Sequence, residues 1–118
     1  MLTLTIKKKW FDMILSGEKK EEDREIKPYW TKRLAKGFGY LNCATFVADV
    51  EKFENDLKDG KDIGSTLADF RNGYGKCVPS FVAYFSLSIG TGKEDWGAEA
   101  GKEYYVLKIH EITERKNY

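Results

Sequence analysis

The sequence predicts a single α+β domain in which a curled sheet or a small β-barrel carries two or three short helices. Apolar residues recur at every second position over 2–6, 80–89 and 104–110, as they do in strands. Apolar residues recur at helical spacing over 10–15. Strands outnumber helices and do not alternate regularly with them, which is typical of α+β domains with a curled sheet or barrel.

Length and composition fit one domain over residues 1–118. The chain has 118 residues, of which 42% are hydrophobic and 14% aromatic, so it can form one packed core. Its net charge is only +1, so the overall charge does not indicate nucleic-acid binding. The charge is unevenly distributed, because residues 1–35 hold nine Lys and Arg against six Asp and Glu. We therefore expect any anion-binding surface to draw on the N-terminal third.

Metal sites and membrane segments are not indicated. The cysteines Cys43 and Cys77 and the single histidine His110 lack the spacing of a zinc site, so we expect no metal and no other cofactor. The N-terminal apolar run is too short for a signal sequence, and no segment approaches the ~20 apolar residues of a membrane helix. We therefore expect a cytoplasmic protein without a membrane partner. The sequence neither supports nor excludes a protein partner.

The N-terminal unit reads as a strand, a short helix and a charged segment. The strand covers 2–6, and the helix over 10–15 ends at Gly17, which occupies the usual position after a helix. Residues 19–26 are nearly all charged and offer no apolar face. Because Lys, Glu and Arg are good helix formers, composition alone favours a solvated helix or a loop there.

The middle of the chain is expected to hold a helix, a strand and a second helix. Pro28 suits the first position of a helix that runs to about Ala35 and ends at Gly37. The apolar and β-branched run over 40–48 predicts a strand. Asp49 then suits the cap of a helix over roughly 50–58.

The C-terminal part contains the two clearest strands. Residues 70–76 read as the end of a strand followed by a glycine-rich turn. Strands over 80–89 and 104–110 are separated by a loop at 90–97.

The charged segment also contains a motif. Residues 17–24 have the form G-x-K-x-x-E-x-R and follow a strand and a short helix, and the sequence Lys-Pro-Tyr-Trp comes soon after them. In this context the chain resembles the ASCH domain family of the PUA-like superfamily. The segments 70–75 and 96–109 are similar to its phage and bacterial branch. The resemblance covers about 1–35 and 68–112, so the segment at about 36–66 would be an insertion.

The resemblance implies that 19–26 forms a strand of a PUA-like barrel and that its charged side chains line a cleft. Residues two apart on a strand share a face, so Glu22 and Arg24 would project together, with Lys19 just before them. Arginine offers a planar donor fork, lysine a point charge and glutamate an acceptor, which suits a nucleobase with a phosphate nearby. The alternative is a solvated face, in which a Glu22–Arg24 pair contributes ~0–1 kcal/mol.

A second group of candidate residues lies in the glycine-rich turn. Glycines there allow a close approach of the backbone to a ligand, and a tyrosine can stack on a base. A plain polar turn between two strands explains the same residues equally well. The candidates are Arg71, Asn72, Tyr74 and Lys76.

The resemblance implies a protein that binds RNA or a modified nucleotide through the charged cleft. The alternative is a hydrolase acting on nucleic acid, either a ribonuclease or an enzyme like the family members that deacetylate N4-acetylcytidine with a Lys, a Thr and a Glu. In an enzyme, Lys19 and Glu22 would be the catalytic residues. The threonine position of the deacetylases corresponds to Glu22, so their hydroxyl nucleophile is missing here.

Overall fold

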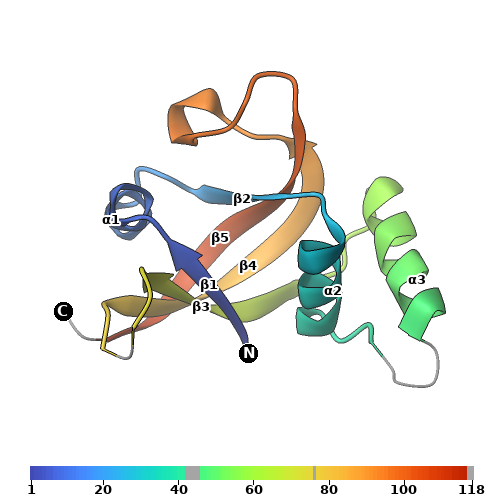
Figure 1. The fold of residues 1–118 in the computed structure, drawn as a ribbon, viewed down its shortest axis with the longest axis horizontal. Coiled ribbons are helices and arrows are strands. Elements are labelled where there is room, and N and C mark those ends of the chain that lie inside the picture. Colours follow the sequence, from blue (N-terminus) through green and yellow to red (C-terminus); the bar gives the residue numbers. More distant parts are fainter. Residues whose placement is uncertain (42–45, 76, 117–118) are drawn as a thin grey trace.

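The computed structural model describes residues 1–41, 46–75 and 77–116, and it confirms the predicted α+β class with a curled sheet and short helices (Figure 1). In chain order the elements are β1 (Leu2–Ile6), α1 (Lys8–Ser16), β2 (Glu21–Glu25), α2 (Pro28–Gly37), α3 (Phe46–Lys58), β3 (Ser65–Asn72), β4 (Ser80–Thr91), the 3₁₀ turn η1 (Glu94–Trp96) and β5 (Glu103–Lys116).

All five strands form one mixed sheet with the order β1-β3-β4-β5-β2. The β1–β3 pair is parallel and the other pairs are antiparallel. The register of β4 against β5 shifts between Val82 and Phe85, and such irregularities increase strand twist and bending. The two edge strands, β1 and β2, are bridged by a side chain, because Arg24 Nη2 donates to the Thr5 carbonyl at 3.0 Å.

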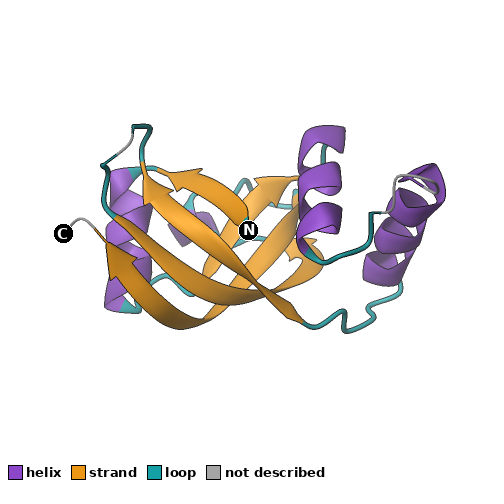
Figure 2. Cartoon of the chain, turned by 90° about the horizontal axis from the view of Figure 1, so that it is seen from below, coloured by secondary structure: helices purple, strands orange, loops and turns teal. Residues whose placement is uncertain are grey.

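The helices lie at the two ends of the curled sheet. Figures 1 and 2 show α1 at one end and α2 beside α3 at the other. As predicted, α1 is followed by Gly17, whose φ of 84° is left-handed and whose N–H bonds to the Ile14 carbonyl. As also predicted, α2 begins at Pro28. Within the described ranges, none of the helices is long and apolar enough to cross a membrane.

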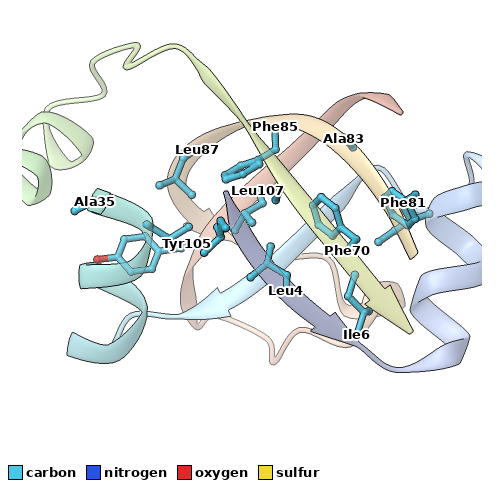
Figure 3. Close-up of a cluster of buried hydrophobic side chains, with 14 of the residues drawn as sticks. Leu4, Ile6, Ala35, Phe70, Phe81, Ala83, Phe85, Leu87, Tyr105 and Leu107 are labelled. Carbon is cyan, nitrogen blue, oxygen red and sulfur yellow. The ribbon is translucent and has the colours of Figure 1, made fainter. Parts of the chain in front are cut away.

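The core fills the concave side of the sheet (Figure 3). Phe70 and Phe81 stack with ring centroids 5.0 Å apart, and Phe11 of α1 packs on Phe81 at 5.1 Å. At the other end, the buried hydroxyl of Tyr105 bonds to the Thr31 hydroxyl at 2.5 Å and so ties β5 to α2.

The strand predicted over 40–48 is wrong for the residues that the structure describes. Helix α3 begins at Phe46, and Tyr40 and Leu41 belong to no strand, while 42–45 lie outside the described residues. A short apolar run cannot be assigned by periodicity alone. The helical spacing of the buried Phe53 and Leu57 decides the structure here. Asp49 lies in the first turn of α3 instead of capping it.

The charged segment is a strand, contrary to the expectation from composition. Residues Glu21–Glu25 form β2, which pairs antiparallel with Lys108–Tyr104 of β5. Helix propensity is a weak preference that such long-range pairing overrides. Strand β3 begins at Ser65 and ends at Asn72, where the sequence predicts the end of a strand before a glycine-rich turn.

Replacing Phe81 with alanine should lower the free energy of unfolding by about 3–5 kcal/mol, because it leaves a cavity between two aromatic rings. Urea denaturation followed by circular dichroism measures the loss. Tyr74→Ala is the matched control, since it removes a ring that is 90% exposed. Similar losses in the two variants would contradict this view of the core.

Candidate functional site

The site is built on the buried ammonium group of Lys19. Helix α1 ends at Gly17, and the Lys19 N–H bonds back to the Met13 carbonyl at 3.0 Å, which turns the chain into the domain. Lys19 is 1% exposed. Its Nζ donates to the Glu21 carbonyl and lies 3.1 Å from Glu22 Oε1. A buried cation is costly unless it is paired, and Glu22 is the partner of the Lys19 ammonium here.

Glu22 joins two cations. It is 6% exposed, and its second carboxylate oxygen, Oε2, lies 3.1 Å from Arg24 Nη1. The Arg24 guanidinium also donates to the Thr5 carbonyl and lies 5.1 Å from the centre of the Trp30 ring. The structure therefore brings the three motif residues together in a cation–anion–cation row. Burial of Lys19 and Glu22 excludes the simple solvated surface pair.

A hollow of about 290 Å³ lies over this row. Glu22 and Arg24 belong to its lining, whereas Lys19 lies beneath it with its Nζ 5.9 Å and 5.8 Å from the ring centres of Trp10 and Trp96. The hollow is lined by Thr5, Ile6, Lys7, Trp10, Glu22, Asp23, Arg24, Trp96, Gly97, Ala98 and Tyr104.

The segment 92–98 forms one wall of the hollow and needs glycine at two points. Gly97 has a left-handed φ of 93°, and a Cβ there would lie 3.0 Å from the Trp10 ring. A Cβ at Gly92 would collide with the carboxylate of Asp23. The glycines therefore let this wall pack directly against α1 and β2, with Trp96 above Lys19.

Asp23 is an acidic group held partly inside the protein. Its Oδ1 is buried and has no hydrogen-bond partner among the residues that the structure describes. Burial raises the pKa of this carboxyl from its ordinary value of 3.8, and the nearby charge of Lys19 opposes that rise.

The second group of predicted residues lies elsewhere. The Arg71 guanidinium donates to the Gly75 carbonyl at 2.6 Å and lies 3.5 Å from Asp69. The Asn72 N–H bonds to the Pro79 carbonyl, and Tyr74 is 90% exposed. Lys76 lies outside the described residues. Of the described residues at 71–75, none belongs to the lining of the hollow, so the two predicted groups do not form one cleft.

Sequence reasoning missed the aromatic side chains of the site. Trp10 belongs to the apolar spacing that predicts the first helix, yet it is only half-buried and contributes to the hollow. The sequence places Trp96 in the loop at 90–97 and Tyr104 in the strand over 104–110, and neither position by itself indicates a site. Only the tertiary structure brings these three rings together, but tryptophan within a glycine-rich loop was a usable signal.

Comparison of the chain with protein-family models, with curated proteins and with solved structures found no match. The resemblance to the ASCH family therefore stays a prediction that depends on the motif at 17–24.

The variant Glu22→Gln should lower the free energy of unfolding by about 3–5 kcal/mol, because it leaves the buried charge of Lys19 without its counter-ion. Chemical denaturation near neutral pH measures this loss. Glu25→Gln is the matched control, since Glu25 pairs with Lys27 and Lys102 at the surface and its loss should change little. Equal stability of the two variants would contradict a structural role for the row.

Asp23 should make folding depend on pH. Between pH 3.8 and its raised pKa, the folded protein binds more protons at this carboxyl than the unfolded chain does. Its contribution to the free energy of unfolding therefore becomes less favourable as pH rises through that window. Asp23→Asn removes the titration, so the stability of the variant relative to wild type should increase from about pH 4 towards neutral pH. Urea denaturation across that range tests this, and a pH-independent difference would count against it.

Proposed function

We propose that this protein binds RNA or a nucleotide, with one nucleobase held in the hollow above the Lys19–Glu22–Arg24 row. The observation that carries the proposal is the composition of the hollow, which combines aromatic rings with a buried carboxylate and a guanidinium. The motif at 17–24 supports it, and on that motif we propose that the chain is a member of the ASCH family.

The size and chemistry of the hollow suit a planar heteroaromatic ring. Its volume of about 290 Å³ lies just below the range of roughly 300–1,000 Å³ that is usual for ligand sites, so it suits one small ring. Trp10, Trp96 and Tyr104 belong to its lining, and aromatic rings are suitable contacts for a base. Glu22 can accept a hydrogen bond from an amino group, and Arg24 can donate to a ring nitrogen or a carbonyl.

The polar groups of the hollow are already oriented. Glu22 is held by cations on both of its oxygens, and Arg24 is held by Glu22, the Thr5 carbonyl and Trp30. Such fixed groups lose little freedom when a ligand binds, which favours affinity and selectivity. Lys7 at the rim adds a cation for a phosphate attached to the bound nucleoside.

Binding is better supported than hydrolysis. The Lys19 ammonium is enclosed and engaged by two acceptors, so a ligand in the hollow does not meet it directly. Glu22 occupies the position of the hydroxyl nucleophile in the deacetylase-like members of the family, and its carboxylate is shared by two cations. A general base with both oxygens so engaged is poorly prepared to take a proton.

Calorimetric titration with ribonucleosides, N4-acetylcytidine and a short RNA tests the proposal. Trp96→Ala should weaken binding about 5- to 150-fold, because stacking of a base on an aromatic ring contributes about 1–3 kcal/mol. Tyr74→Ala is the control, since this exposed ring lies outside the hollow lining and its loss should leave affinity unchanged.

Two results would speak against the proposal. Folded wild-type protein that binds none of these ligands would exclude it. Chromatography of the same mixtures would reveal deacetylated nucleoside or shortened RNA if the protein is a hydrolase. The hydrolase would be favoured if such products form with wild type and disappear with a folded Glu22→Gln variant.

A further inference from the structure

We infer that the ligand is a single-stranded polynucleotide rather than a free nucleotide. The nucleotide chain that leaves the hollow would follow the free edge of strand β1 and reach helix α2. This inference rests on the proposed function, because it extends the same site.

A row of alternating arginines and aromatic rings leads away from the hollow. The Arg24 guanidinium, which belongs to the lining, lies 5.1 Å from the centre of the Trp30 ring. Arg33 lies 5.4 Å from the same ring and 5.3 Å from the ring of Tyr29. Tyr29 and Trp30 meet edge to face at 5.0 Å. Four consecutive groups thus connect the hollow to the surface of α2.

The edge of β1 fixes the spacing of this row. Arg24 donates to the Thr5 carbonyl at 3.0 Å and Arg33 to the Thr3 carbonyl at 2.7 Å. Residues two apart on a strand are separated by about 7 Å, a step that one nucleotide can span. Thr3 and Arg33 line a second hollow of about 380 Å³, which also includes Lys36 and Thr66. The two hollows therefore follow one another along β1.

The charge on α2 matches a phosphate backbone. The helix carries Lys32, Arg33 and Lys36 and has no acidic residue. Within the part of the chain that the structure describes, Arg33 and Lys36 have no carboxylate within ion-pair distance, whereas Lys8, Lys52 and Lys102 do. Cations that the protein itself does not neutralise are those that gain most from binding phosphates.

The position of Tyr29 favours single-stranded RNA over double-stranded RNA as the ligand. Tyr29 is 60% exposed, and Arg33 holds its ring through a hydrogen bond of 3.0 Å to its hydroxyl. An exposed ring held in this way can stack on a base next to the one in the hollow. Stacking at either place requires bases that are free of a partner strand.

The test compares a single ribonucleoside with a five-nucleotide RNA that contains it, in wild type and in Tyr29→Ala and Lys36→Ala. Wild type should bind the oligonucleotide at least about tenfold more tightly than the nucleoside. Tyr29→Ala should weaken oligonucleotide binding about 5- to 150-fold. Lys36→Ala should make the slope of the logarithm of the binding constant against the logarithm of the salt concentration shallower by about 0.7, because one phosphate contact is lost. Neither variant should change the affinity for the nucleoside.

The control is Lys108→Ala, which removes an exposed lysine on β5 that belongs to neither hollow. It should leave both affinities as in wild type. If the nucleoside binds but the oligonucleotide binds no more tightly, or if a duplex binds equally well, this inference is overturned and the proposed function stands. If neither ligand binds, both are overturned.

Discussion

The buried ammonium of Lys19 is the constraint on which the candidate site depends. A charge with so little exposure needs a fixed counter-ion, and Glu22 supplies it at 3.1 Å. That pairing holds β2 against the end of α1, and the tryptophans at 10 and 96 cover the same ammonium from two sides. The row of charges therefore positions both the floor and the aromatic walls of the hollow.

The same row also contributes to the fold. Arg24 is held by Glu22 on one side and reaches the Thr5 carbonyl on the other, so it links the two edge strands of the sheet. Residues that share one hydrogen-bonded network do not contribute independently of one another. Site geometry and sheet curvature are thus coupled, and a change at Glu22 affects both.

The sequence predicted the parts of the fold that local physics determines. Apolar residues at every second position identified β1, β4 and β5, and the glycine at 17 identified the end of α1. Local patterns failed where tertiary contacts decide. The run at 40–48 has the composition of a strand, but helix α3 begins within it, and the charged segment forms a strand only because β5 pairs with it.

The sequence predicted the charged side chains of the candidate site but not its aromatic side chains. Glu22 and Arg24 are two residues apart, which predicts that they share one face of a strand. In the structure Glu22 Oε2 lies 3.1 Å from Arg24 Nη1. No periodicity relates Trp10 to Trp96, because they reach the same hollow only through the packing of the 92–98 segment on α1. The glycine-rich turn at 71–75 has a suitable composition for a site, but the fold places it away from the hollow lining.

The hydrogen bonds from Arg24 and Arg33 to the carbonyls of β1 also bear on aggregation. An edge strand whose carbonyls are unoccupied can recruit a strand from a neighbouring molecule and begin aggregation. In β1 the carbonyls of Thr3 and Thr5 are already taken by Arg33 and Arg24. Bulky charged side chains at these points obstruct intermolecular pairing, so Arg24 and Arg33 protect the free edge of β1 from a strand of another molecule.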